Sequence, residues 1–282
     1  MAQAESIGLI GEASKTARRV VAITGGSSGI GLALAEAYAA QGCAVAIMAR
    51  SLVGLEKAAA HLQAKFAAEV LVYVGDVAFE TNCIQFYESI MVRFGRADIL
   101  ICNAGLTMRA TVADADTAVL ERLMQVNYLG AVYCSKAFLP ALLAANGWLV
   151  AIGSVAAHRG LPARSGYSAS KAALLAYMEA LRTEMLDAPI QILTVSPGYT
   201  ASGIRQRALL ANGQVQGQSP MEERKMMPAS QVARAVVEAI AHGRRHIIVG
   251  RQAWFIVWLN RLFPAWMDRR VQAFYARVSV KS

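Results

Sequence analysis

VVAITGGSSGIG, residues Val20–Gly31, decides the fold of this chain: an apolar run of strand length leads directly into a glycine-rich loop in which a helix begins. Glycines allow a tight turn and a close backbone approach to a ligand, and free N–H groups at a helix N-terminus attract phosphate. Alone, such a loop has a purely structural alternative, but its place between a first strand and a first helix favours phosphate binding. The pattern therefore predicts a dinucleotide pyrophosphate site built from Gly25, Ser27, Ser28, Gly29, Ile30 and Gly31.

Apolar runs of strand length alternate with segments of helical period along the chain. Helices are expected over Ile30–Gln41 and Leu55–Phe66, and strands over Val20–Thr24, Ala44–Ala49, Val70–Gly75, Asp98–Asn103, Trp148–Ser154, Gln191–Ser196 and His246–Gly250. Continuous apolar strands joined by helices indicate a parallel sheet covered on both faces. We expect an α/β fold, a single Rossmann-type doubly wound parallel sheet of about seven strands with helices on both faces, plus a C-terminal helical extension. The expected division is an N-terminal extension at 1–19, a Rossmann-type domain at 20–250 and a helical tail at 251–282.

Length and composition are typical of one globular domain. The chain has 282 residues, of which 56% are hydrophobic and 17% are charged. Its four cysteines lie apart in apolar stretches without a CxxC pair, so we expect small buried side chains in a reducing compartment and no metal site. Residues 1–19 lack the apolar core of a signal peptide, which makes the cytoplasm the expected location.

The end of the second expected strand indicates which dinucleotide is bound. An acid at this position would bond both hydroxyls of the adenosine ribose and favour NAD(H). Here Ala49 occupies the position and Arg50 follows. A guanidinium binds a 2′-phosphate through two hydrogen bonds, although a solvated surface arginine is the alternative. We therefore expect NADP(H), and NAD(H) less.

A phenol and an ammonium group stand four residues apart in Tyr167-Ser168-Ala169-Ser170-Lys171, on one face of a helix. A phenol with a pKa near 10 is a poor base at neutral pH, and a nearby ammonium lowers that pKa towards the working range. Ser154 precedes Tyr167 by 13 residues, at the carboxyl end of an expected strand. Ligands bind at that edge in open α/β sheets, although a turn or capping role would also suit a serine.

The sequence resembles the short-chain dehydrogenase/reductase family over about Val20–Gly250. The motifs occur in the order typical of that family: Thr24–Gly31, Asp76-Val77, Asn103-Ala104-Gly105, Asn127, Ser154, Tyr167, Lys171 and Pro197-Gly198. So many matches in the same order make the resemblance specific. The resemblance implies an NADP(H)-dependent oxidoreductase that interconverts a ketone and a secondary alcohol.

The resemblance also implies roles for the catalytic residues. Tyr167 would protonate the carbonyl oxygen in reduction and act as the base in oxidation. Lys171 would bind the nicotinamide ribose and lower the pKa of the phenol. Ser154 would hold the substrate oxygen, and Asn127 would position a water that links Lys171 to solvent.

Further residues are expected at the cofactor. Asp76 would meet the adenine, and Asn103 would support the central strand and the glycine loop. The remaining cofactor contacts implied by the resemblance are Val77, Ala104, Gly105, Pro197 and Gly198.

The sequence departs from the family pattern at two places. Cys102 stands where a second asparagine is usual, and we expect little effect because the position is buried. After Pro197-Gly198 the usual x-Val-x-Thr is replaced by Tyr199-Thr200-Ala201-Ser202. Ser202 keeps a hydroxyl at the last position and Thr200 is a second candidate, so which of them bonds the nicotinamide carboxamide stays open.

Local strings, Glu121–Val132 among them, resemble the branch that contains 3-ketodihydrosphingosine reductases and 11β-hydroxysteroid dehydrogenase-like enzymes. This resemblance implies a small lipophilic carbonyl or alcohol substrate, contacted by the loop with Val155, His158 and Leu161 and by a mobile lid at Gly203–Met227. His158 is expected to be a loop histidine and not a second base. A 3-oxoacyl (fatty-acid-type) reductase is one alternative. A non-catalytic dinucleotide-binding sensor or scaffold is another, which the complete catalytic set disfavours.

The tail carries most of the net charge. Residues 243–282 hold eight basic side chains and one acid, hence +7 of the formal +9, so a membrane surface explains the charge as well as nucleic acid would, and we expect no nucleic-acid partner. Trp254, Trp258, Leu262 and Trp266 recur every four residues as one helical stripe, and Pro264 should bend or break the helix. Two interpretations stay open: a helix packed on its own domain or on a partner subunit, and an interfacial helix on an anionic membrane. The resemblance further implies a homodimer or homotetramer. The expected location is the cytoplasm, with peripheral membrane contact through the tail as the open alternative.

Overall fold

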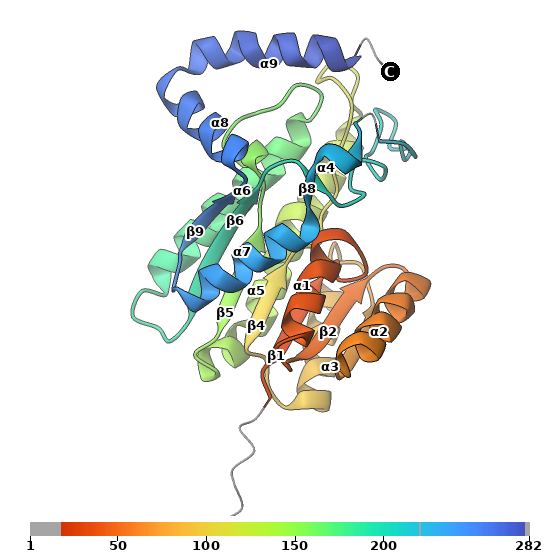
Figure 1. Cartoon of the computed structure of the whole chain (residues 1–282), viewed down its shortest axis with the longest axis vertical. Helices are drawn as coiled ribbons and strands as arrows, with labels where there is room; N and C mark the ends of the chain where they lie inside the picture. The colour runs from red at the N-terminus through yellow and green to blue at the C-terminus, as the bar shows by residue number, and fades with distance from the viewer. Residues whose placement is uncertain (1–17, 220, 280–282) are drawn as a thin grey trace, which may run out of the picture.

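Seven parallel strands form the single large sheet in the computed structural model of the protein, which describes residues 18–219 and 221–279. The expected N-terminal extension lies almost wholly outside the described residues. The strand order is β3-β2-β1-β4-β5-β6-β9, which confirms the expected doubly wound fold; Figure 1 labels these strands except β3. Its strands are β1 (Val20–Thr24), β2 (Ala44–Ala49), β3 (Val70–Val74), β4 (Ile99–Cys102), β5 (Trp148–Ile152), β6 (Gln191–Pro197) and β9 (His246–Val249).

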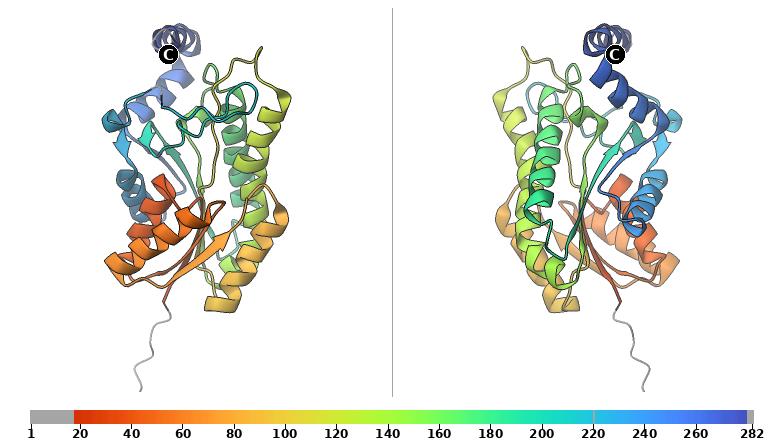
Figure 2. Two further views of the ribbon diagram at one scale, coloured as in Figure 1. Left: turned by 90° about the vertical axis from the view of Figure 1, so that its right-hand side faces the viewer. Right: turned by 90° about the vertical axis from the view of Figure 1, so that its left-hand side faces the viewer.

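Helices cover both faces of the sheet, as the two side views in Figure 2 show. One face carries α1 (Gly29–Ala39), α2 (Leu52–Phe66) and α7 (Ala229–Ala241). The other face carries α3 (Glu80–Phe94), α4 (Thr117–Met124), α5 (Gly130–Ala144) and α6 (Ser165–Glu184). Each face therefore has its own hydrophobic core.

The central strand β1 shows why apolar runs without polar alternation form this sheet. Val20 and Ala22 point into the core under α3–α6, whereas Val21 and Ile23 point into the core under α1, α2 and α7. All four are at most 2% exposed. Because successive side chains of a strand point to opposite faces, a strand buried on both sides needs apolar residues at every position.

The observed elements differ from the expected ones mainly at their ends. The second helix begins at Leu52 and not at Leu55, because Ser51 caps it by accepting a hydrogen bond from the N–H of Gly54 at 3.2 Å. Strands β4 and β5 end before Asn103 and Ser154, so both polar residues lie in the turns beyond the sheet. This places them at the carboxyl edge, where ligands bind.

The tail forms two helices, α8 (Arg251–Leu262) and α9 (Pro264–Ser279), above the carboxyl edge of the sheet (Figure 1). Helix α8 ends at Leu262, and Phe263 joins it to α9. Pro264 is the first residue of α9, a position that proline tolerates. The helix break expected at Pro264 is confirmed, and it divides the stripe: Trp254 and Trp258 stack on α8, whereas Trp266 lies on α9.

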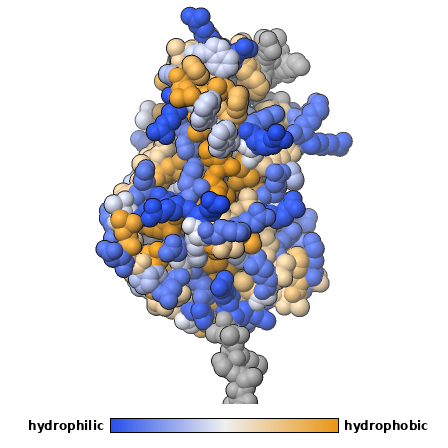
Figure 3. Space-filling model, turned by 60° about the vertical axis from the view of Figure 1, so that its left-hand side comes forward, coloured by the Kyte–Doolittle hydropathy of each residue, from blue (hydrophilic) through white to orange (hydrophobic). Residues whose placement is uncertain are grey.

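Most large apolar side chains of the tail face outwards. Trp254, Phe255, Trp258, Leu262, Phe263, Trp266 and Phe274 are 46–55% exposed. Ala253 and Met267 are the buried side chains of the described tail. Figure 3 shows hydrophobic surface mixed with charged groups at this end of the molecule. The tryptophans of the tail are thus about half exposed and are not part of the two buried cores.

Candidate active site

A cleft lies at the carboxyl edge of the sheet, where the strand order reverses between β1 and β4. Its volume of about 360 Å³ is within the range of small-molecule sites. All the expected site residues except Gly29, Gly31 and Asn127 line it: Gly25, Ser27, Ser28, Ile30, Arg50, Asp76, Val77, Asn103, Ala104, Gly105, Ser154, Tyr167, Lys171, Pro197, Gly198, Thr200 and Ser202. One cleft therefore gathers residues from across the sequence.

The glycine loop has the geometry of a backbone cradle at the start of α1. Gly29 has a φ of +56°, a conformation that favours glycine. A Cβ on Gly31 would lie 2.2 Å from the carbonyl oxygen of Gly25, so only glycine fits there. Ser28 precedes the helix and makes no side-chain capping bond. The first N–H groups of α1 thus face the cleft without a capping side chain, which suits an anion such as pyrophosphate.

Thr24 and Asn103 tie the loop to the neighbouring strand. The Thr24 hydroxyl oxygen accepts hydrogen bonds from the N–H groups of Asn103 and Ala104, both at 3.0 Å. The Asn103 side-chain amide donates to the carbonyls of Thr24 at 2.9 Å and Gly25 at 3.2 Å. These bonds hold the ends of β1 and β4 in register, so the loop keeps its shape.

The adenosine end of the cleft holds Arg50 and Asp76. Arg50 is exposed at its mouth and forms no salt bridge within the described part of the chain. Asp76 pairs with Arg122, and its other carboxylate oxygen accepts from the N–H of Ala78 at 3.0 Å. At this end of the cleft the Arg50 guanidinium has no acidic partner among the described residues, whereas the Asp76 carboxylate is paired with Arg122.

Ser154, Tyr167 and Lys171 meet at the base of the cleft. Ser154 and Tyr167 line the cleft together. Burial raises the pKa of the Tyr167 phenol, while the neighbouring Ser154 hydroxyl and the positive charges of Arg164 and Arg205 lower it. Lys171 is 3% exposed and donates to the carbonyl of Ile152 at 2.7 Å. Burial lowers the pKa of Lys171 to about 8.

Asn127 is buried and does not line the cleft. It lies in a π-helical turn (Gln125–Leu129) between α4 and α5. Its side-chain oxygen accepts from the N–H of Leu106 at 2.8 Å, and its amide donates to the carbonyl of Leu106 and to Ser170, both at 2.9 Å. The π turn therefore locks the loop after β4 onto α6, one residue before Lys171.

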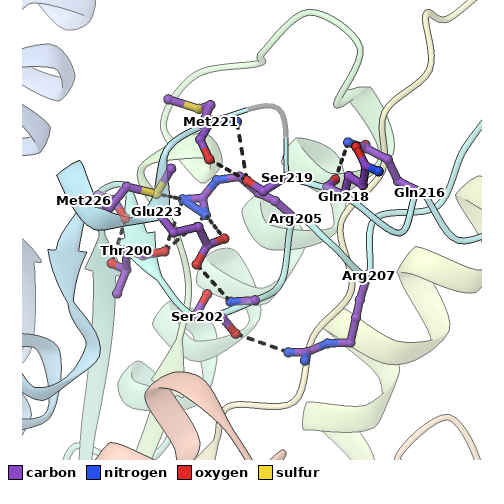
Figure 4. Close-up of polar contacts among 12 residues, drawn as sticks. Thr200, Ser202, Arg205, Arg207, Gln216, Gln218, Ser219, Met221, Glu223 and Met226 are labelled. Atoms are coloured by element: carbon purple, nitrogen blue, oxygen red, sulfur yellow. Dashed lines mark hydrogen bonds and ion pairs between the residues drawn. The ribbon is translucent and has the colours of Figure 1, made fainter. Parts of the chain in front are cut away.

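The segment expected to form a lid runs between two short paired strands, β7 (Thr200–Ala201) and β8 (Met227–Pro228), and borders the cleft. Figure 4 shows Arg205 at its centre. Both terminal nitrogens of Arg205 donate to the carbonyl of Thr200 at 3.1 Å, and Nη1 lies 3.7 Å from Glu223, in the short helix η3 (Glu223–Lys225). Because Arg205 is 3% exposed, it holds the two arms of the lid together from inside.

The two hydroxyls that follow Pro197-Gly198 have different surroundings. Thr200 is buried, and its hydroxyl donates to the carbonyl of Gly198 at 3.0 Å. Ser202 lies against the glycine loop: a Cβ on Gly29 would be 2.8 Å from the Ser202 carbonyl oxygen and 3.0 Å from its Cβ. The lid therefore rests on the loop through Ser202, and the hydroxyl of Thr200 is already bonded.

Several residues of the cleft carry no sequence motif. Arg164, Arg205 and Arg207 line it, and nothing but their charge in largely neutral segments marks them in the sequence. Conversely, His158 does not line it. The ring of His158 bonds the Ser196 hydroxyl at 2.9 Å, and burial lowers its pKa, which fits a structural loop histidine.

The cysteines sit in the core, away from this chemistry. All four, Cys43, Cys83, Cys102 and Cys134, are buried and free. Burial raises the pKa of the Cys102 thiol to about 12. Among the described residues no group of histidine, cysteine and acidic side chains has the arrangement of a metal site.

Comparison with known proteins agrees with this geometry. The family model described as short chain dehydrogenase matches residues 19–212. Dehydrogenase/reductase SDR family member 7B from Mus musculus is 31% identical over 234 residues, which are 82% of this chain and 72% of that protein. 11-beta-hydroxysteroid dehydrogenase 1A from Arabidopsis thaliana is 33% identical over 246 residues, 85% of this chain and 70% of that protein. The chain belongs to the short-chain dehydrogenase/reductase family.

Solved structures show the same fold. An alcohol dehydrogenase from Thermococcus sibiricus in complex with 5-hydroxy-NADP has a TM-score of 0.74 and 26% identity, and it covers 82% of this chain and 96% of its own. A family member from Burkholderia phymatum in complex with NAD has a TM-score of 0.79 at 22% identity, over 89% and 95%. This protein is accordingly an oxidoreductase of alcohol and ketone groups whose fold binds a nicotinamide dinucleotide.

Proposed function

We propose that the protein is an NADP(H)-dependent oxidoreductase that interconverts a ketone and a secondary alcohol on a lipophilic small molecule. The observation that carries this proposal is the meeting of Ser154, Tyr167 and Lys171 in the cleft that the glycine loop borders. A non-catalytic sensor or scaffold would need none of these groups to face one another. The complete, connected set favours an enzyme.

The chemistry of the residues follows from their contacts. Ser154 and Tyr167 face the same cleft, so a substrate oxygen held by both would lie within reach of the phenolic proton. Tyr167 gives that proton in reduction and takes it in oxidation, and the charges of Arg164 and Arg205 stabilise its phenolate. When bound, NADP(H) supplies or accepts the hydride at the substrate carbon.

Lys171 and Asn127 complete the proton path in this proposal. The Lys171 ammonium uses one of its donors on Ile152, which leaves the others for the nicotinamide ribose and for a water. A Cβ on Gly105 would lie 3.2 Å from the Asn127 oxygen and 3.5 Å from the Lys171 nitrogen. The two residues therefore flank one glycine, which supports the proposed water relay between them.

The cofactor assignment rests on Arg50 and on the lack of an acid at Ala49. Because Arg50 lines the cleft and has no acidic partner among the described residues, a 2′-phosphate is the natural occupant. We assign Ser202 to the nicotinamide carboxamide, because the Thr200 hydroxyl is engaged with Gly198 and Ser202 lies at the loop.

The lipophilic substrate is inferred from the side chains that line the cleft near Tyr167, which are mostly apolar: Leu106, Val126, Val155, Ala156, Leu161 and Ile204. Such a lining solvates a hydrocarbon skeleton and leaves orientation to the few polar groups. The Arabidopsis relative is named as a hydroxysteroid dehydrogenase, which supports this class. A 3-oxoacyl reductase remains the alternative, and its thioester substrate would also place a ketone at Ser154.

We also propose that the tail attaches the protein to an anionic membrane and brings the cleft to the lipid. Exposed tryptophans and arginines on α8 and α9 suit the headgroup level. Asn260 of α8 donates to the carbonyl of His158 at 3.2 Å, and Arg159 bonds Asn260 and Asp268, both at 2.5 Å. The tail is thus tied to the loop after Ser154. No helix in residues 18–219 and 221–279 is long and apolar enough to cross a bilayer, so the proposed contact is peripheral.

We place the protein in the cytoplasm, at the membrane surface, as a homodimer or homotetramer. The test of the proposed function is oxidation of NADPH with a panel of ketones: steroids, long-chain ketones and 3-oxoacyl thioesters. Turnover of the lipophilic ketones supports the proposal. Dinucleotide binding without turnover of any ketone or alcohol would favour the sensor.

A further inference from the structure

Arg207 bridges the lid and the glycine loop. Its Nη2 donates to the carbonyl of Ser202 at 3.2 Å, within the lid, and lies 3.5 Å from the hydroxyl of Ser28, 179 residues away in the loop. Figure 4 shows its guanidinium turned back towards Ser202. The turn at Gly203, with a φ of +67°, permits this: a Cβ there would lie 3.4 Å from Nη1 of Arg207. The guanidinium of Arg207 therefore lies between the lid segment and the glycine loop.

A second cation stands nearby. Arg50 and Arg207 line the same cleft. Partial burial lowers the pKa of the Arg207 guanidinium, and the charge of Arg50 lowers it further. The carboxylate of Glu223 partly offsets these two effects on Arg207, but it also lies 3.7 Å from Arg205 and accepts from the N–H of Gly203 at 3.4 Å. Two like charges held together at the free N-terminus of a helix are unfavourable unless an anion lies between them.

We propose that Arg207 is a cofactor ligand: carried by the lid, it binds the pyrophosphate of the dinucleotide at the start of α1, so that cofactor binding closes the lid. The inference deepens the function proposed above and rests on it. In the complex the Ser28 and Ser202 contacts hold the guanidinium over Gly29, the point where the lid touches the loop. A charge-assisted bond to a phosphate oxygen is stronger than these neutral contacts.

The location separates this role from that of Arg50. Arg50 follows β2, at the adenosine ribose, whereas the contacts of Arg207 are with Ser28 and Ser202, at the N-terminus of α1. The pyrophosphate is common to NADPH and NADH, and the 2′-phosphate is not. Arg207 should therefore support the binding of both cofactors equally, and Arg50 should discriminate between them.

The experiment is titration calorimetry of Arg207→Ala, Arg207→Lys and wild-type protein with NADPH, NADH, ADP and adenosine 2′-phosphate. Arg224→Ala is the matched control, because Arg224 is an exposed arginine of the same lid that does not line the cleft. We expect Arg207→Ala to lose roughly ten- to a hundredfold in affinity for NADPH, NADH and ADP and little for adenosine 2′-phosphate. Arg207→Lys should recover part of the loss.

Tryptic cleavage after Arg224 and Lys225 gives a second readout that needs no turnover. NADPH at saturating concentration should slow this cleavage in the wild type, and much less in Arg207→Ala, if Arg207 couples the cofactor to the lid. Equal affinities in wild type and Arg207→Ala would overturn the inference, and so would a loss confined to NADPH and adenosine 2′-phosphate. If the wild type binds no dinucleotide at all, the proposed function itself fails, a result distinct from either of these.

Discussion

The ammonium of Lys171 donates a 2.7 Å hydrogen bond to the carbonyl of Ile152, the last residue of β5. Through this bond α6 is fixed against the carboxyl edge of the sheet, two residues before Ser154. The distance from Lys171 to Tyr167 is set by one helical turn, so a single contact positions both residues opposite Ser154. The positions of Tyr167 and Lys171 are therefore set by the contact of α6 with the sheet edge.

Tyr167→Phe should abolish turnover while NADPH still binds. The phenylalanine keeps the ring, but it cannot exchange a proton with the substrate oxygen. The measurement is the rate of ketone-dependent NADPH oxidation beside the dissociation constant for NADPH. Ser154→Ala serves as the comparison, because it removes the hydroxyl that neighbours the phenol and retains Tyr167. Substantial turnover in Tyr167→Phe would remove this residue from its role.

The pH dependence of stability should report the buried Lys171. Its pKa is lowered from 10.5 to about 8 in the folded protein, so between pH 8 and pH 10.5 the unfolded chain binds more protons there. The free energy of unfolding contributed by this residue therefore rises with pH across that window. Relative to Lys171→Met, the wild type should gain on the order of 3 kcal/mol between pH 7 and pH 10.5.

Urea unfolding of the cofactor-free proteins at pH 7 and at pH 10.5 measures this difference. The hydrogen bond to Ile152 that Lys171→Met removes is lost at both pH values, so it largely cancels in the comparison. Other titrating groups are the same in both proteins. A difference between the two proteins that does not change with pH would show that Lys171 keeps its ordinary pKa.

Arg50→Ala should weaken NADPH binding far more than NADH binding. Loss of a charge-assisted pair with the 2′-phosphate costs about 1.5–3 kcal/mol, or roughly ten- to a hundredfold in affinity. Fluorescence titration of both cofactors measures the ratio, and Lys57→Ala, an exposed cation on α2, is the control. Equal losses for the two cofactors would mean that Arg50 is a solvated surface group.

The sequence was sufficient to predict those parts of the site that depend on local chemistry. Glycine spacing after an apolar run indicated the loop at Gly25–Gly31, and a helical spacing of four placed Tyr167 and Lys171 on one face. Arg207 could not be predicted, because its position depends on a contact with Ser28, 179 residues away. Its segment has neither helical nor strand periodicity, so no pattern tells which side chain turns inwards.

The tail shows the same limit. A period of four predicted one stripe, but Pro264 cannot donate the hydrogen bond that a continuous helix needs, and the chain turns at Phe263. The tryptophans of α8 and α9 therefore lie on two helices. Whether a stripe of tryptophans is buried depends on which element packs against it, and the periodicity of the sequence carries no information about that neighbour.

Intact protein should sediment with anionic vesicles at low salt, and the variant Arg261→Glu/Arg269→Glu/Arg270→Glu should not. These three arginines are exposed on α8 and α9, and Arg270 lies 4.9 Å over the Trp266 ring. Each is worth about 1 kcal/mol near an anionic surface, so the three together contribute roughly a hundredfold to the partition. Phosphatidylserine vesicles at low and high salt give the measurement, with phosphatidylcholine vesicles beside them.

A control variant of equal charge change, with exposed cations elsewhere replaced (Lys57→Glu/Arg224→Glu/Arg234→Glu), separates the effect of the tail from the effect of net charge, and it should still bind the vesicles.

The rival occupant of the exposed aromatic surface is a second copy of the chain. Replacing Trp254 and Trp258 by serine would then lower the molar mass in light scattering, whatever the lipid. If the intact protein ignores anionic vesicles and these serine variants dissociate, the tail is a subunit interface and the membrane proposal is wrong. Lipid binding that salt and the Arg→Glu changes abolish, with an unchanged molar mass, assigns the tail to the membrane, because only an anionic surface requires those charges.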